Sequence, residues 1–92
     1  VAAARRVERL DALRAELGDA VHPVALDVRD AEAVHAVVAG LPEDLAALDV
    51  VVGNAGLALG MGPAQEASWA DWEQMIDTNV RGLAATVHAV LP

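Results

Sequence analysis

Two asparagines and a small-residue turn carry the most chemical information in this chain. Asn54, Ala55 and Gly56 directly follow an apolar run at residues 50–52, and Asn79 lies within a later amphipathic pattern. A buried parallel strand reads as a continuous β-branched run, and such sheets bind ligands in the crevice beyond the carboxyl ends of their strands. The pattern therefore predicts that this turn contacts a bound nucleotide.

Strand and helix patterns alternate along the chain and would position that turn. Short apolar stretches predict strands at residues 1–4, 21–28 and 49–52. Apolar side chains at helical spacing predict helices at residues 5–17, between Asp30 and Gly40, and from Ser68 to Val90. Gly18, Asp30 and Ser68 are the expected cap residues, and residues 53–67 are expected to form a surface loop.

This alternation is typical of a parallel sheet with right-handed crossovers. We therefore expect an α/β fold of the Rossmann type, a doubly wound parallel sheet with about three strands and three helices present. A chain of 92 residues holds fewer strands than this fold usually has. We interpret residues 1–92 as the central segment of one nucleotide-binding domain.

Composition limits the partners that the chain can bind. A formal net charge of -8 argues against a nucleic-acid surface or an anionic membrane, because both attract clustered Lys and Arg. Cysteine is absent, and no apolar run is long enough to span a bilayer. His22, His35 and His88 share no helical spacing, so we predict no metal site and place each histidine at the surface or an interface.

Three short motifs give the chain a family resemblance: Leu-Asp-Val at residues 26–28, Gly-Asn-Ala-Gly at 53–56 and Thr-Asn-Val-Arg-Gly at 78–82. In order and spacing they resemble the short-chain dehydrogenase/reductase family. The longer runs at residues 54–61 and 71–79 are similar to the NADP-dependent 3-hydroxy acid dehydrogenases, also described as serine or L-allo-threonine dehydrogenases. The resemblance implies an NAD(P)-binding Rossmann domain over residues 1–92 and hydride transfer between a nicotinamide and a secondary alcohol.

The resemblance also implies roles for two residues that end the second predicted strand. Asp27 would accept a hydrogen bond from the adenine amino group, and Val28 would flank the adenine ring. Asp27 could instead simply terminate the strand or begin the next turn, because Asp is common in turns.

Further site residues follow from the same resemblance. Asn54, Ala55 and Gly56 would lie along the cofactor ribose, where small side chains permit close approach, although a plain tight turn has the same composition. Val80 would also contact the cofactor. Asn79 would hold a water of the catalytic proton relay. Because Asn is unfavourable in a helix interior, Asn79 also predicts a local distortion of the helix.

Charge at the end of the first predicted strand indicates which cofactor binds. NAD-specific sheets place an acidic residue there to bind the ribose hydroxyls, whereas an Arg accommodates the 2′-phosphate of NADP. Here Arg5 and Arg6 follow Ala4, and the first acid is Glu8. We expect Arg5 as the main phosphate ligand and Arg6 as the second, hence NADP rather than NAD. Two solvated arginines in a first helical turn are the alternative, which the helix dipole disfavours unless an anion is near.

The chain departs from the family pattern in two ways. Gly53 replaces an Asn whose side chain links neighbouring strands, which affects rigidity more than chemistry. Residues 1–92 also contain no Tyr, and all six basic residues are Arg. The family's proton donor is a Tyr assisted by a Lys, so we expect these residues alone to be catalytically inactive.

The resemblance implies a cytoplasmic enzyme with a small-molecule substrate that forms a homodimer or homotetramer through the helix carrying Asn79. Candidate interface positions on that helix are Val80, Ala84, Val87, His88 and Leu91. Two other functions fit the alternating pattern. One is a noncatalytic nucleotide-binding or scaffold protein that kept the fold. The other is a phosphoacceptor signalling domain, which needs a Lys that this chain lacks.

Overall fold

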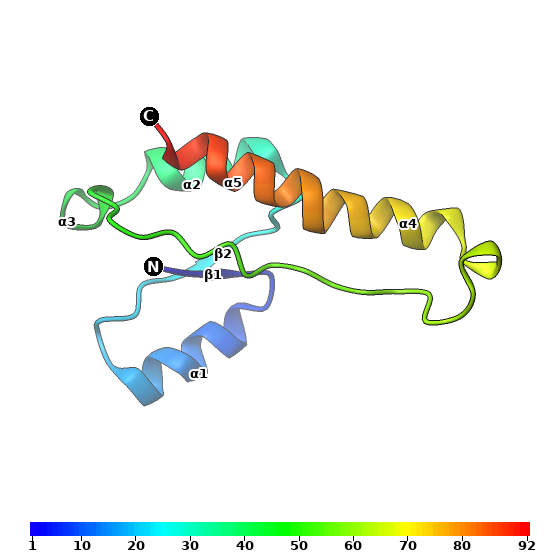
Figure 1. Cartoon of the computed structure of the whole chain (residues 1–92). Helices are drawn as coiled ribbons and strands as arrows, with labels where there is room; N and C mark the ends of the chain where they lie inside the picture. The colour runs from blue at the N-terminus through cyan, green and yellow to red at the C-terminus, as the bar shows by residue number, and fades with distance from the viewer.

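Helices lie on both faces of a small parallel sheet in the computed structural model, which describes residues 1–92 (Figure 1). Strand β1 (Ala2–Ala4) pairs with β2 (Pro23–Ala25) in parallel, with Ala3 opposite Val24. Helix α1 (Val7–Leu17) connects the two strands along one face of the sheet. This strand–helix–strand unit confirms the predicted order of elements in the first third of the chain.

Local capping interactions set the ends of the first two helices. Helix α1 ends at Gly18, whose φ of 84° is a conformation that residues with a side chain rarely adopt. Helix α2 (Ala31–Ala39) begins after Asp30, whose Oδ1 accepts a hydrogen bond from the Ala33 N–H at 3.0 Å. Both caps were predicted from residue type alone, and both are confirmed.

The last predicted helix is present but contains a distorted turn. Helix α4 (Trp69–Ile76) begins after Ser68, whose hydroxyl accepts a hydrogen bond from the Asp71 N–H at 3.1 Å. A π-helical segment, η2 (Asp77–Gly82), follows and leads directly into α5 (Leu83–Val90). The predicted distortion around Asn79 is therefore confirmed as a π-helical turn, a feature frequent at functional sites.

The prediction of a third strand is wrong for this structure, because residues 49–52 have no neighbouring strand with which to pair. Within residues 49–62 the only hydrogen bond between two backbone groups runs from the Asn54 N–H to the Val52 carbonyl at 3.1 Å. Val50 and Val52 are 78% and 79% exposed. The sheet therefore has two strands, not three.

Two short elements lie outside the segments that were predicted to be helices. Helix α3 (Glu43–Ala46) lies between α2 and the unpaired segment 49–52, and a 3₁₀ turn, η1 (Ala64–Glu66), precedes α4. Each follows a proline, Pro42 or Pro63, at its N-cap. Proline restricts the backbone before a helical turn, which explains why both short turns begin there.

Little of the chain is fully buried. Leu10 and Val34 form its hydrophobic core, and helices α2 and α5 pack together on the face of the sheet opposite α1 (Figure 1). The radius of gyration is 15.2 Å, whereas a compact domain of this length has about 12 Å. The arrangement is thus open, with apolar side chains exposed along α4 and α5. None of the helices combines the length and the hydropathy needed to cross a membrane.

Candidate functional site

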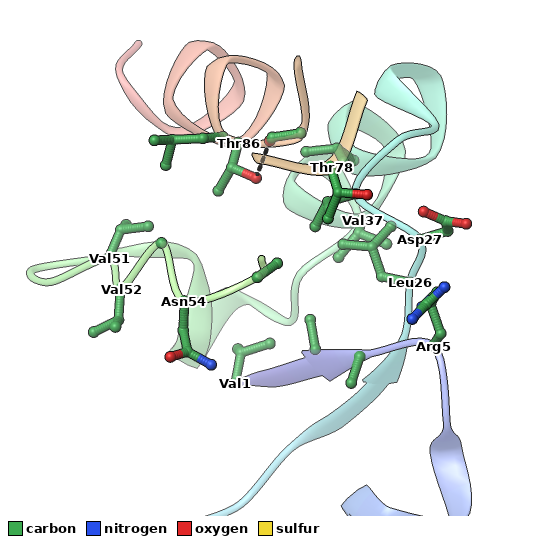
Figure 2. A pocket seen from close by; sticks show the side chains of 18 of the residues that line it. Val1, Arg5, Leu26, Asp27, Val37, Val51, Val52, Asn54, Thr78 and Thr86 are labelled. Carbon is green, nitrogen blue, oxygen red and sulfur yellow. Dashed lines mark hydrogen bonds between the residues drawn. The ribbon is translucent and has the colours of Figure 1, made fainter. Parts of the chain in front are cut away.

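A cavity of about 520 Å³ lies along the free edge of β1 and beyond the carboxyl ends of both strands. Figure 2 shows Val51 and Asn54 on one side of the cavity, and Arg5 and Asp27 on the other. Helices α2 and α5 contribute apolar side chains between these two sides.

Most of the predicted cofactor residues line this one cavity, namely Arg5, Arg6, Asp27, Val28, Asn54, Ala55 and Gly56. Val80 does not line it, and its side chain is 62% exposed. Asn79 does not line it either, but contacts Leu57, which does. The tertiary structure thus brings together residues from three distant motifs, as the sequence predicted for the end of a parallel sheet.

Three arginines gather where β1 ends and α1 begins. Arg5, Arg6 and Arg9 are exposed, line the cavity and take part in none of the salt bridges of the structure. The free backbone N–H groups in the first turn of α1 add partial positive charge at the same place. Sequence reasoning missed Arg9, although its position three residues after Arg6 on a predicted helix indicates the same face. The positive charge of this region therefore favours the binding of an anion.

Asp27 is held by a residue that sequence reasoning also missed. The Arg29 backbone N–H and Nε donate to Asp27 Oδ1, each at 3.0 Å, and Arg29 Nη2 donates to Oδ2 at 2.6 Å. These hydrogen bonds from the Arg29 side chain and backbone, together with the charges of Arg29 and Arg5, lower the pKa of Asp27 to about 2, against the opposing effect of burial. Asp27 is therefore a carboxylate, which can only accept hydrogen bonds, over the whole neutral range.

Asn79 joins the distorted helix to the turn that follows residues 54–56. Its Oδ1 accepts a hydrogen bond from the Leu57 N–H at 2.9 Å, and its Nδ2 donates to the Leu57 carbonyl at 2.8 Å. The side chain of Asn79 thus pairs with both the N–H and the carbonyl of Leu57, as a residue of a neighbouring strand would. One amide hydrogen and one acceptor position of Asn79 remain available to a water molecule.

Two glycines allow the helices to approach the cavity closely. Gly82, in η2, is buried, and a Cβ added there would lie 2.6 Å from Val28 Cγ2 and 3.3 Å from the Val28 carbonyl oxygen. A Cβ at Gly53 would lie 2.5 Å from Leu83 Cδ1. Any side chain at position 53 therefore requires the end of the Leu83 side chain to move.

The fold also brings together two of the three histidines. His88 Nδ1 on α5 lies 3.2 Å from His35 Nε2 on α2, and the rings form an edge-to-face pair with centroids 5.1 Å apart. Both side chains are exposed, which confirms the predicted surface positions. A hydrogen bond between these nitrogens requires one to carry a proton and the other to lack one. The pair lies across the α2–α5 contact and outside the cavity.

Comparison with known proteins identifies the class to which this arrangement belongs. The family model for short chain dehydrogenases matches residues 1–92. The chain therefore belongs to the short-chain dehydrogenase family, and its fold is a partial α/β fold of the Rossmann type. The predicted family resemblance is confirmed.

Sequence identity to individual dehydrogenases supports this family membership. The chain is 51% identical to a serine 3-dehydrogenase of Rhizobium radiobacter over 88 residues, which are 96% of this chain and 35% of that protein. It is 51% identical over 92 residues to the NADP-dependent 3-hydroxy acid dehydrogenase YdfG of Escherichia coli (strain K12), which is 100% of this chain and 37% of that protein.

A solved dehydrogenase structure is similar to this chain in fold and in sequence. The closed form of a serine dehydrogenase complexed with NADP+ matches with a TM-score of 0.94 and 51% identity, over 98% of this chain and 36% of that one. The chain thus spans little more than a third of the length of each of these three relatives.

Proposed function

We propose that this protein is an NADP(H)-dependent oxidoreductase that transfers a hydride between the nicotinamide and a secondary alcohol or carbonyl, with a small 3-hydroxy acid as substrate. The observation that carries the proposal is the cluster of Arg5, Arg6 and Arg9 at the end of β1, without an intramolecular ion pair. Relatives named as serine and 3-hydroxy acid dehydrogenases support the substrate class.

The cofactor's phosphate end is assigned to the arginines. Arg5 and Arg6 bind the 2′-phosphate, and Arg9 adds a third positive charge one helical turn further along. The N-terminus of α1 supports the same anion through its free N–H groups. No acidic side chain lies at the end of β1 to bind the ribose hydroxyls of NAD instead.

The rest of the cavity is assigned to the nucleoside. Asp27 and Val28 bind the adenine, and the small residues Asn54, Ala55 and Gly56 lie beside the ribose. The acceptor-only carboxylate suits the adenine amino group, and the cationic end suits the 2′-phosphate of NADP. When bound, NADP+ would accept the hydride of the alcohol or NADPH would donate one to the carbonyl, and these residues would bind and orient the cofactor.

Asn79 is assigned to the proton relay. Its amide holds Leu57 in place, and the remaining amide positions are free for the relay water. Val80 is proposed as a cofactor contact from the family resemblance alone, since it does not line the cavity and is 62% exposed.

We also propose a homo-oligomer and a cytoplasmic location. The helix from α4 to α5 exposes apolar side chains at Val87 and Leu91, which another subunit would cover. The cytoplasmic location rests on the family resemblance alone.

Titration of the full-length protein with NADPH and with NADH, followed by nucleotide fluorescence, tests the cofactor assignment. Hydrogen bonds to charged groups contribute about 1.5–3 kcal/mol each. The double variant Arg5→Ala/Arg6→Ala should therefore bind NADPH roughly a hundredfold more weakly, with little change for NADH. Arg14→Ala is the matched control, because Arg14 lies on α1 outside the cavity and pairs with Asp19 at 3.5 Å.

The possible outcomes separate the hypotheses. Equal affinity of the wild type for NADPH and NADH, or an unchanged preference in the double variant, contradicts the phosphate assignment. Tight NADPH binding without oxidation of any 3-hydroxy acid supports the noncatalytic nucleotide-binding alternative instead.

A further inference from the structure

The Asp27–Arg29 pair at the edge of the cavity has a geometry that limits what Asp27 can bind. Oδ1 accepts from the backbone N–H and Nε of Arg29, while Oδ2 accepts from Nη2 and, at 3.1 Å, also from Nε. The Nε hydrogen is thus shared between the two oxygens. Arg29 thus donates three hydrogens to the Asp27 carboxylate.

A carboxylate offers about four acceptor positions. Arg29 fills three of them, which leaves one for a ligand in the cavity that both residues line. Because the guanidinium is planar and contacts both oxygens, it also fixes the plane of the carboxylate. The free position therefore has a defined direction rather than the freedom of a rotating side chain.

The chemistry of a single acceptor position selects between purines. An adenine presents an amino group at C6, which donates a hydrogen bond to a carboxylate. A 6-oxopurine presents a carbonyl oxygen at the same place, and two acceptors repel each other. The pKa of about 2 keeps Asp27 from gaining a proton that it could donate to such a carbonyl.

The backbone of this turn is held independently of the Arg29 side chain. The Asp30 N–H donates to the Asp27 carbonyl at 3.1 Å, and Asp30 itself caps α2 through Ala33. Loss of the guanidinium should thus free the Asp27 carboxylate without unfolding the turn.

We propose that Arg29 is a positioning residue that orients the Asp27 carboxylate and leaves it one acceptor position, so that the site selects a 6-aminopurine over a 6-oxopurine nucleotide. The proposal rests on the proposed function, since it deepens the adenine end of the NADP(H) site. Arg29 is exposed and lies outside the three motifs, so neither its burial nor the family resemblance indicates that it positions Asp27.

The test compares NADPH with its hypoxanthine analogue, which differs only in the C6 substituent. Fluorescence titration of the full-length wild type should give roughly tenfold tighter binding of NADPH, because one charged hydrogen bond distinguishes the ligands. In Arg29→Gln this ratio should fall to about two. Arg14→Gln is the matched control, because Arg14 pairs with Asp19 at 3.5 Å outside the cavity and should keep the ratio of the wild type.

Each result supports or overturns the proposal. A ratio that stays near the wild-type value in Arg29→Gln overturns the role of Arg29 and leaves the proposed function intact. Failure of the wild type to bind either nucleotide overturns the proposed function itself. If Arg29→Gln does not fold, Arg29→Lys replaces it, because Lys keeps the charge without the planar fork and should also lower the ratio.

Discussion

The two sides of the cavity are held in different ways. On one side, β1 and β2 are joined by a parallel ladder, which backbone hydrogen bonds from Ala2 to His22 and from Leu26 to Ala4 extend beyond the paired residues. On the other side, the segment at residues 50–57 has no strand partner, and the Asn79 amide ties its end to the helix. Backbone pairing holds the first side, and side-chain contacts, above all those of Asn79, hold the second.

This difference indicates which amino-acid substitutions should affect the cavity most. A ladder tolerates most changes of side chain, because its hydrogen bonds belong to the backbone. The second side depends more strongly on side-chain identity, above all on Asn79, which lies 22 positions from Leu57. The first side also has one position that is sensitive to substitution, where Gly82 meets Val28, three residues beyond the end of β2.

The largest expected effect comes from Gly82→Ala, which acts on the ladder side of the cavity. The new Cβ would approach the side chain and carbonyl of Val28 to between 2.6 and 3.3 Å. Overpacking of this kind costs about 1–3 kcal/mol, of which the better helix propensity of Ala offsets part. We expect a loss of about 2 kcal/mol in the free energy of unfolding, measured by urea denaturation.

Gly62→Ala is the control for that experiment, since a Cβ at Gly62 would meet nothing within 4 Å. Equal stability of the two variants would show that η2 can move away from β2 without cost, and that this side of the cavity is not fixed.

A smaller effect is expected from Asn79→Ala, which acts on the unpaired side. The variant loses both hydrogen bonds to Leu57, and water replaces them in part because the site is exposed. We expect a loss of about 1 kcal/mol in unfolding free energy. Faster amide hydrogen exchange at Leu57 should accompany this loss. Gln74→Ala on α4 serves for comparison, and unchanged exchange at Leu57 in Asn79→Ala would mean that another contact holds this segment.

The smallest effect is a pH dependence at Asp27, because water screens this exposed ion pair. The pKa of Asp27 is lowered from 3.8 to about 2 in the folded protein. Its contribution to stability is therefore present above pH 3.8 and decreases as the pH falls toward 2. Arg29 and Arg5 face this carboxylate, and Asp77 also acts on Arg29.

Asp27→Asn removes this titration. The difference in unfolding free energy between the wild type and this variant should shrink when the pH is lowered from about 5 to about 2.5. A difference that stays constant over this range would show that the ion pair does not stabilise the fold.

Sequence reasoning was most successful where structure depends on near neighbours. The caps at Asp30 and Ser68 are hydrogen bonds across three residues, and the distortion at Asn79 follows from the residue's own preference against helix interiors. The motifs that predicted the family were likewise short and ordered. Pattern and residue type were sufficient for these features because few alternative partners exist within one helical turn.

The same reasoning failed where a partner strand was required. An apolar run at residues 50–52 has the composition of a strand, but a strand also needs a neighbour with free backbone groups, and none lies beside this segment. The contact of His35 with His88 joins residues 53 positions apart, which no local spacing predicts.

The sequence by itself determined the helix ends, the family and most of the residues that meet at the cavity. Only the tertiary structure decided that Arg29 holds Asp27, that Asn79 holds Leu57, and that residues 50–52 remain unpaired. The physical reason is the range of the interactions. Caps and helical spacing depend on dihedral preferences and on neighbours within four residues, whereas side-chain direction and strand pairing depend on how distant segments pack in space.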